Sequence, residues 1–171
     1  LEERKIHLSR AFGTYTYPAD FLLVAATNPC PCGYYPDPVR CRCSSREIER
    51  YLSKISGPIL DRMDLCVEVS PVSLQELSET KENESSAVMR QRIQQARDRQ
   101  EKRYRNTSYH YNSQLSGADT LKYCILEKPQ KKLLETAFHT MGLSARAYHK
   151  ILKVARTIAD LENCDEIRQE H

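Results

Sequence analysis

Four closely spaced cysteines constrain the fold of this chain more than any other feature of its sequence. They form a C-x-C-x8-C-x-C array of Cys30, Cys32, Cys41 and Cys43. The loop that contains them is too short to build a hydrophobic core, and prolines stiffen its turns. Four thiolates can surround one tetrahedral Zn²⁺ and leave no open coordination position, which predicts a structural rather than a catalytic site. Disulfides, free thiols and an iron–sulfur cluster are the alternatives that the sequence leaves open.

Length, composition and charge limit the rest of the chain only loosely. The 171 residues suffice for one large domain or two small ones, and the 40% apolar and 29% charged residues are typical of a soluble globular protein. A net charge of +3 is weak support for an anionic partner. No stretch approaches the ~20 apolar residues of a membrane span, and no signal peptide begins the chain, so we expect a cytoplasmic protein with no membrane contact. The chain starts without an initiator Met and both of its ends break off in mid-pattern, which predicts a fragment of a longer protein.

The first part of the chain has the pattern of an α/β domain. Phe21–Ala26 is an unbroken apolar run, which is typical of a strand covered on both faces in a parallel sheet. A second strand is predicted at Leu65–Val69, and a short polar helix at Ser45–Leu52 lies between the two. The opening residues 4–20 favour a hairpin. The order strand, helix, strand predicts the end of an α/β domain.

The remainder predicts an all-α bundle. Helices are expected at residues 85–104 and 128–142 and from Ser144 onward, with a loop at residues 106–117 and Gly142 as a helix stop. The isolated Cys66, Cys124 and Cys164 are expected to be buried as small apolar residues. The side chains that repeat at helical spacing, and that we expect to face the core, are Met89, Ile93, Ala96, Leu133, Leu134, Ala137, Phe138, Met141, Tyr148, Ile151, Leu152, Ala155, Ile158 and Ala159.

Three polar residues stand where a ligand could bind, and each has a structural alternative. Asn28 follows the first apolar run, beyond which ligands of parallel sheets bind, although an Asn before Pro also initiates turns. Arg62 precedes the second predicted strand, where it could stabilise phosphoryl-transfer charge or make only a surface ion pair. Arg146 begins the last helix, where a cation opposes the helix dipole unless an anionic ligand binds there.

The first long helix carries a basic segment. Its cations outnumber Asp98 and Glu101, and tyrosines follow it in the sequence. This combination suits contact with a nucleic-acid backbone and stacking on bases, and it equally suits a solvated helix face with internal ion pairs. The residues concerned are Arg90, Arg92, Arg97, Arg99, Lys102, Arg103, Arg105, Tyr104, Tyr109 and Tyr111.

Three long segments resemble one protein family. The strings "FLLVAATNPCPCGYY", "KISGPILDRMDL" and "GLSARAYHKILKVARTIADLE", in this order, are similar to those of magnesium-chelatase-like AAA+ ATPases of the ComM/YifB type. The resemblance implies an α/β fragment at residues 1–75, the end of the P-loop ATPase core with its cysteine loop, followed by a helical lid at residues 76–171. It implies that the fold is mainly helical overall.

The resemblance also implies roles for the three polar residues. Asn28 matches the sensor 1 position, Arg62 matches the arginine finger that acts on a neighbouring subunit, and Arg146 matches sensor 2, which contacts the bound nucleotide. No G-x4-G-K-[ST] phosphate loop occurs in the 171 residues, so ATP and Mg²⁺ are expected to bind only in a full-length protein, and the chain alone is expected to be inactive.

The function implied by the resemblance is an ATP-driven DNA motor of the helicase or branch-migration type, related to competence and recombination. Its partners would be DNA and further copies of itself in a ring, which we expect to be a hexamer. Two rivals stay open: a magnesium-chelatase-like ATPase that remodels a protein, and a non-enzymatic binding module stabilised by zinc.

Overall fold

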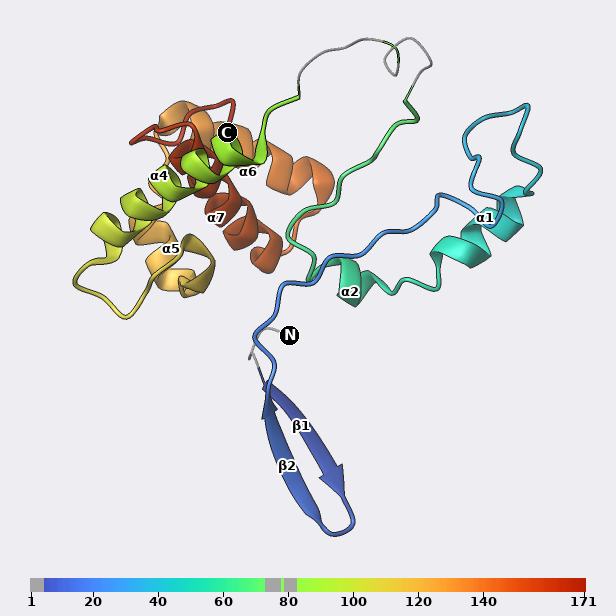
Figure 1. The fold of residues 1–171 in the computed structure, drawn as a ribbon, viewed down its shortest axis with the longest axis horizontal. Coiled ribbons are helices and arrows are strands. Elements are labelled where there is room, and N and C mark those ends of the chain that lie inside the picture. Colours follow the sequence, from blue (N-terminus) through green and yellow to red (C-terminus); the bar gives the residue numbers. More distant parts are fainter. Residues whose placement is uncertain (1–4, 73–77, 79–82) are drawn as a thin grey trace. The chain divides into compact units, whose positions relative to one another are not determined.

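The chain divides into two compact units, Leu1–Met63 and Asp64–His171. A computed structural model describes residues 5–72, 78 and 83–171, and its elements are labelled in Figure 1. Helices predominate among these residues, as the sequence predicts.

The first unit opens with an antiparallel hairpin, which confirms the prediction for residues 4–20. Strand β1 spans Lys5–Arg10 and strand β2 spans Gly13–Pro18, so only Ala11 and Phe12 connect them. The register pairs the first residue of β1 with the last of β2 and continues without a bulge to Arg10 opposite Gly13. Every residue of both strands is exposed, and Figure 1 shows the hairpin as a two-stranded ribbon.

The two predicted strands at Phe21–Ala26 and Leu65–Val69 are not strands in this structure. Both segments are irregular, and their apolar side chains are exposed, with Leu22 at 89% and Val69 at 85%. A strand exists only through hydrogen bonds to a neighbour. Within the described residues the hairpin is the only sheet, so neither segment has a neighbouring strand to pair with.

Two short helices complete the first unit. Helix α1 spans Ser45–Leu52, the predicted bounds, and helix α2 spans Gly57–Leu60. The start of α1 is determined locally by a capping box, because the Ser44 hydroxyl accepts from the Glu47 backbone N–H while the Glu47 carboxylate accepts from that of Ser44. No sequence pattern predicts α2.

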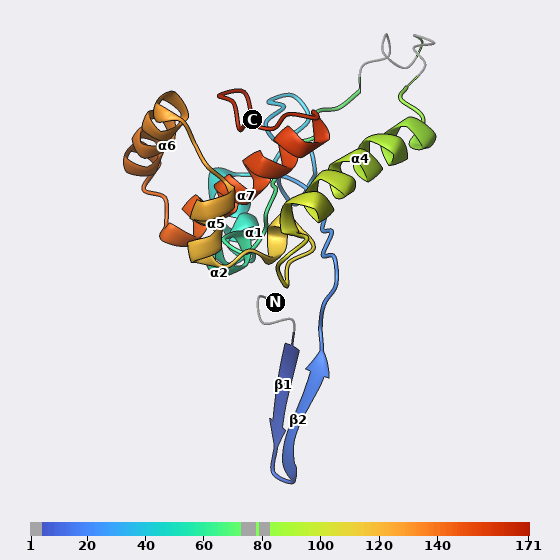
Figure 2. The same cartoon turned by 90° about the vertical axis from the view of Figure 1, so that its left-hand side faces the viewer.

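The second unit is a helical bundle, with α4 at Ser86–Tyr104, α6 at Lys128–Met141 and α7 at Ala145–Leu161. These three helices confirm the predicted ones to within a residue or two. A 3₁₀ turn, η1 at Asn112–Gln114, and helix α5 at Gly117–Tyr123 occupy residues for which the sequence indicated no helix. Figures 1 and 2 show α4 running beside α7, and α5 also packs on α7.

Local capping sets the helix ends in the second unit. Serine side chains cap the starts of α4, α5 and α7, where Ser85, Ser116 and Ser144 each accept a backbone N–H from the first turn. Helix α6 ends at Gly142, whose φ of 60° is the left-handed conformation that glycine adopts without strain.

The core of the second unit is smaller than the sequence pattern predicts. Leu134, Leu152, Ala155 and Ala159 are buried as expected. The buried apolar cluster also includes residues from outside the long helices, namely Leu115, Cys124 and Ile167. Several predicted core residues are instead exposed: Met89, Ile93, Leu133, Met141 and Ile151. Of the isolated cysteines only Cys124 is buried, whereas Cys66 is exposed and Cys164 is half-buried, so the burial predicted for these two is wrong.

Helix α4 turns polar residues into the unit's interior. Among its described residues it buries Ala96, Gln100 and Tyr104, whereas two of its three predicted stripe residues face solvent. The buried face therefore lies toward its C-terminal half.

Among the helices that the structure describes, none has both the length and the apolar character needed to cross a bilayer.

Candidate functional site

The four cysteines of the array lie together in the first unit. Their sulfur atoms all lie within 4.8 Å of one another. The Cys30 Sγ is 3.3 Å from that of Cys32 and 3.8 Å from that of Cys41, and the Cys32–Cys41 separation is 3.7 Å. All four are free thiols, so none of the disulfides that the sequence left open is present.

The loop folds back through two turns that bring the Cys-x-Cys pairs together. The Gly33 N–H donates to the Cys30 carbonyl at 3.1 Å, which closes the first pair into a tight turn. Asp37 then receives the backbone N–H groups of Val39 and Arg40 on its carboxylate, and its own carbonyl accepts from Cys41. These local hydrogen bonds, typical of an aspartate turn, return the second pair to the first.

The sulfur spacing fits a tetrahedral metal ion. A zinc–sulfur distance near 2.3 Å places the sulfurs of a regular ZnS₄ tetrahedron about 3.8 Å apart. Two of the three short separations lie close to that value, and the third is shorter. Four soft sulfur donors with no other ligand type suit zinc or an iron–sulfur cluster better than Mg²⁺ or Ca²⁺, which prefer oxygen.

The pKa values of the thiols differ within the cluster. Hydrogen bonding from the Tyr34 backbone is the main reason that the pKa of the Cys32 thiol falls to about 6. Hydrogen bonding to the Cys32 backbone lowers the pKa of Cys43, but the neighbouring Cys32 sulfur and burial outweigh it and raise that pKa to about 12. One thiolate therefore disfavours the next, as expected of like charges at short range.

Asn28 lies beside this cluster, two residues before Cys30. Its side chain is exposed, and its carboxamide lies against Gly33, where a methyl group added to the glycine would come within 3.8 Å of the carboxamide carbon. Gly33 has a φ of 83°, so only a residue without a Cβ adopts this turn readily. The segment before Asn28 is irregular rather than a strand, so Asn28 is not at the end of a sheet strand in this structure.

Arg62 lies just after helix α2 in the first unit. Its Nη1 donates to the Pro58 carbonyl at 2.8 Å, and its backbone N–H donates to Ile59. The side chain is exposed. The contact across the end of α2 matches the structural alternative for an arginine at a helix end, and it leaves the remaining guanidinium donors in an exposed position.

Arg146 belongs to the second unit, in the first turn of α7. It is exposed and follows Ser144, the residue that caps the helix. A cation in this turn faces the positive end of the helix dipole, which the predicted anionic ligand would offset. Asn28 and Arg62 belong to the first unit, so the structure assigns the three candidates to two separate units.

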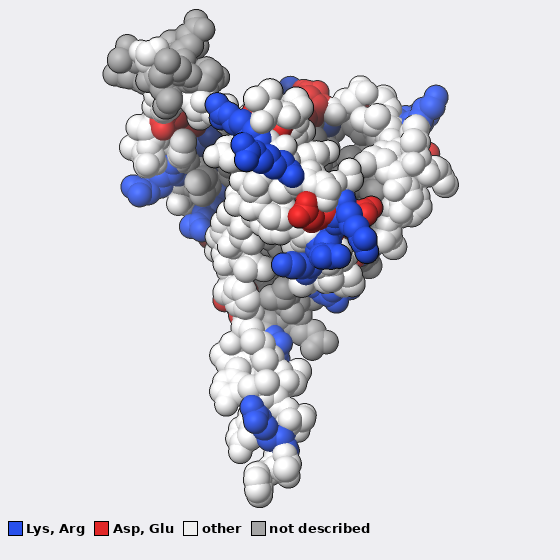
Figure 3. All heavy atoms as spheres, turned by 90° about the vertical axis from the view of Figure 1, so that its right-hand side faces the viewer, with Lys and Arg blue, Asp and Glu red and all other residues white. Residues whose placement is uncertain are grey.

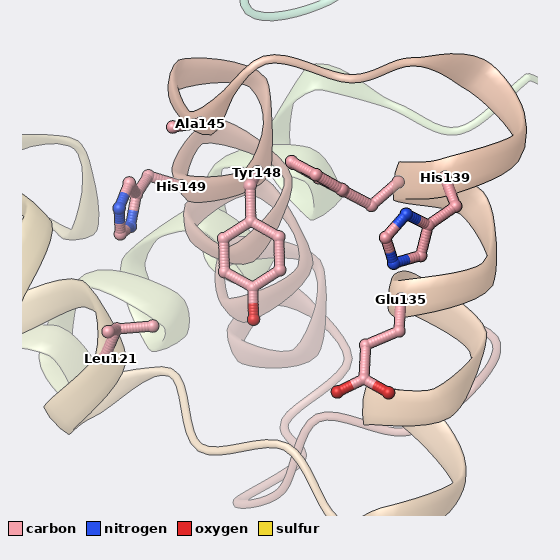
Figure 4. A pocket seen from close by; sticks show the side chains of 7 residues that line it. Leu121, Glu135, His139, Ala145, Tyr148 and His149 are labelled. Atoms are coloured by element: carbon pink, nitrogen blue, oxygen red, sulfur yellow. The ribbon is translucent and has the colours of Figure 1, made fainter.

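A cavity of about 360 Å³ opens beside the first turn of α7. Figure 4 shows Tyr148 and His149 of α7 across from Glu135 and His139 of α6. The Phe138 and Tyr148 rings meet edge to face with centroids 6.1 Å apart. His149 Nδ1 is buried with no hydrogen-bond partner among the described residues. The sequence analysis did not anticipate this cavity, because its lining comes from three helices.

Two arginines of the basic segment of α4 form ion pairs with the C-terminal part of the second unit. Arg103 forms a two-pronged ion pair with Asp160 of α7, at 2.8 and 2.5 Å, and Arg99 pairs with Asp165. Tyr104 is 1% exposed, so of the two alternatives that the sequence left open, base stacking does not apply to this residue. For these residues the structure supports the alternative of internal ion pairs.

Sequence reasoning missed the polar network around Asp160. Its carboxylate also accepts from Asn112 Nδ2 at 2.9 Å and lies 3.2 Å from Arg156. Asp160 and Arg156 are 1% and 4% exposed. Both share the predicted apolar face of the last helix with Leu152 and Ala159. Charged residues on such a face are the sequence feature that could have indicated a buried ion pair.

Two family models match the chain. The model described as "Magnesium chelatase, subunit ChlI" matches residues 1–77, and "Magnesium chelatase, subunit ChlI C-terminal" matches residues 83–171. Among curated proteins, YifB of Escherichia coli (strain K12) is 42% identical and competence protein ComM of Haemophilus influenzae is 41% identical. Both alignments span 172 residues, 100% of this chain and 33% of the relative. The chain thus spans about a third of the length of these relatives.

Proposed function

The chain belongs to the magnesium chelatase ChlI family, and from that premise we propose that it forms part of an ATP-driven AAA+ motor that acts on DNA. The observation that carries the proposal is the setting of its three family-matched polar residues. Asn28, Arg62 and Arg146 are all exposed, at a loop, after a short helix and at a helix N-terminus. None of them belongs to the buried polar network that holds the second unit together.

Each of these residues has a distinct role in the proposal. Asn28 acts as sensor 1 and orients the attacking water or the terminal phosphate. Arg62 acts as the arginine finger and stabilises charge on the phosphoryl group of a nucleotide held by the neighbouring subunit. Arg146 acts as sensor 2 and pairs with phosphate oxygens at the N-terminus of α7. ATP with Mg²⁺ supplies the phosphoryl group.

We assign the activity to the full-length protein. The 171 residues contain no phosphate loop, and the relatives are about three times as long. We propose that residues 1–75 complete an α/β ATPase core and that residues 76–171 form its lid. The exposed apolar segments at Phe21–Ala26 and Leu65–Val69 support this, because strands of such a core would cover them. An arginine finger acting on a neighbour requires a ring, for which we propose a cytoplasmic hexamer.

The hairpin supports DNA as the client. Residues 5–19 contain Lys5, His7 and Arg10 but no acidic residue, and Figure 3 shows basic side chains on this ribbon. Phe12 at the turn is 97% exposed. Basic residues attract phosphates and exposed rings stack on bases, so a ribbon of this composition suits single-stranded or branched DNA. We therefore include a helicase or branch-migration role of the full-length protein in the proposal.

Turnover by an Arg62→Ala variant of the full-length protein tests the ATPase assignment. We expect kcat to fall by about 10³-fold or more while ATP affinity changes little, because the finger contributes to the transition state rather than to binding. Arg50→Ala, which removes an exposed arginine of α1, is the matched control and should leave turnover unchanged. Lost binding with retained turnover would contradict the assignment.

A protein-remodelling ATPase is the second candidate, favoured by the name of the matching family. Binding of the full-length protein to branched DNA separates the two candidates. The DNA motor should bind with a steep salt dependence and should lose about fivefold or more in affinity on Phe12→Ala. Val39→Ala, at another exposed loop position, is the control. Absence of DNA binding favours the remodelling ATPase, and absence of ATPase activity favours a zinc-stabilised binding module.

Zinc is our proposal for the occupant of the cysteine cluster. The support is that the sulfurs of Cys30, Cys32 and Cys41 lie 3.3 to 3.8 Å apart, with that of Cys43 within 4.8 Å of them. Cys30 is also the only buried residue among those described in the first unit. A single Zn²⁺ would be held by Cys30, Cys32, Cys41 and Cys43 and would act structurally. Metal analysis of the purified protein should find about one zinc per chain.

A further inference from the structure

We propose that the four-cysteine cluster positions Asn28, so that metal binding by the cluster governs the geometry of the nucleotide-sensing residue. The inference rests on the proposed role of Asn28 and on the fit of a metal to the cluster. Its structural basis is the short connection from the Asn28 carboxamide to the sulfur ligands through Gly33.

The first link is the close approach of the Asn28 side chain to the turn at Gly33. The Asn28 carboxamide lies against Gly33, because a methyl group built on that glycine would come within 3.8 and 3.9 Å of its Cγ and Nδ2 atoms. Gly33 is in turn joined to Cys30 by a 3.1 Å backbone hydrogen bond. The surface that supports Asn28 is therefore the turn that carries the first two cysteines.

The second link is a stiff backbone. Asn28 precedes Pro29 and Cys30 precedes Pro31, and a residue before proline is largely confined to extended conformations. The proline rings fix their own φ angles as well. Few rotations remain between Asn28 and Cys30, so the placement of the Cys30 sulfur is transmitted to the asparagine.

Apart from its local turn hydrogen bonds, the loop has little apolar packing to hold it. Tyr34, Tyr35 and Val39 are exposed at 52%, 48% and 87%. Cys30 is fully buried, and it is buried among the other cysteines. A metal bound to four sulfurs would supply the cross-links that a hydrophobic core supplies elsewhere, and its loss would release the turn beneath Asn28.

Two variants of the full-length protein distinguish the positioning of Asn28 by the cluster from a general loss of structure. Cys41→Ser removes a ligand from the far side of the loop. Gly33→Ala keeps all four ligands but strains the turn beside Asn28, because the φ of Gly33 is 83°. Cys66→Ser controls for the loss of an exposed cysteine. Gly142→Ala controls for left-handed strain, since its φ is 60° and no atom lies within 4 Å of the added methyl group.

We expect Cys41→Ser to lose zinc, to speed amide exchange at residues 27–33 and to lower kcat by about 10- to 100-fold with ATP affinity nearly unchanged. Gly33→Ala should retain zinc and still lower kcat. Combining Cys41→Ser with Asn28→Ala should cost no more than Asn28→Ala alone, because both act through the same side chain.

The outcomes distinguish this inference from the proposed function. Additive losses in the double variant, or unchanged exchange at residues 27–33 after zinc loss, would overturn the positioning of Asn28 by the cluster. If Asn28→Ala retains full turnover while zinc loss still speeds exchange there, the cluster does position Asn28 and the sensor role in the proposed function is what fails.

Discussion

The two units of this chain are stabilised in different ways. In the first unit the only buried residue among those described is Cys30, and its surroundings are other cysteines. The second unit buries an apolar cluster around Leu152 and, beside it, the charged residues Arg156 and Asp160. The second unit therefore depends on packing and a satisfied polar network, whereas the first has no apolar core among its described residues and would be stabilised by the metal that we propose for its four sulfurs.

The difference also separates residues that hold the fold from those available for chemistry. Arg103 of the second unit uses its guanidinium to bind Asp160 and Asn112 Oδ1. Arg62 of the first unit makes a contact with a nearby backbone carbonyl and stays exposed. Arginine content alone therefore says little about ligand binding, and the surroundings of each guanidinium decide which of the two roles it can have.

Metal removal should give the largest contrast between the units. Chelation of zinc should abolish slow amide exchange across residues 30–52, because the metal replaces a core there, and should leave exchange in α7 unchanged. Hydrogen exchange followed by mass spectrometry measures both regions in one experiment. Equal loss of protection in both units, or none in either, would contradict the idea that only the first unit depends on the cluster.

Breaking the charged network should give the next largest effect, confined to the second unit. Asp160→Ala leaves the buried Arg156 and the partly buried Arg103 without their carboxylate partner and should destabilise the unit by about 3–5 kcal/mol. Denaturant unfolding measures the change. Asp165→Ala is the matched control, because that side chain is 95% exposed and its ion pair should contribute about 0–1 kcal/mol. Similar losses for both variants would show that the burial of Asp160 is unimportant.

Alkaline pH should give the smallest effect, again in the second unit. Burial is the main cause that raises the pKa of Tyr104 to about 12, from about 10 in an unfolded chain. Because the folded pKa is the higher one, the contribution of Tyr104 is fully present below about pH 10 and is lost as the pH rises toward 12. Absorbance titration of the tyrosines, with Tyr104→Phe as control, measures this. Ionisation of Tyr104 near pH 10 would contradict its burial.

Caps and stops were predictable because they act locally. Ser144 begins α7 and Gly142 ends α6 at the positions that the sequence indicates, and α1 has the predicted bounds. A cap needs a side chain and a backbone group only two or three residues apart, so its partners are adjacent in the sequence. The cysteine array was predictable as a cluster for a similar reason, since two turns suffice to close it.

Burial and strand pairing were less predictable. The apolar stripe of α4 gave the correct face but the wrong extent, because Ala96 is buried whereas Met89 and Ile93, nearer the start of the helix, are exposed. The run at Phe21–Ala26 has a strand's composition but no neighbouring strand among the described residues. For the candidate site, residue types and order were apparent from the sequence, whereas the contact of Asn28 with Gly33 was not.

The sequence by itself determined the helix ends, the hairpin and the grouping of the four cysteines, since each results from interactions between near neighbours. The tertiary structure alone decided that Arg103 and Tyr104 are structural and that Asp160 lies at the centre of a polar network. Arg103 and Asp160 are 57 residues apart in the chain. Partners at that separation meet only when whole helices pack, because the free energy of an ion pair depends on where packing places both charges and how far it removes them from water.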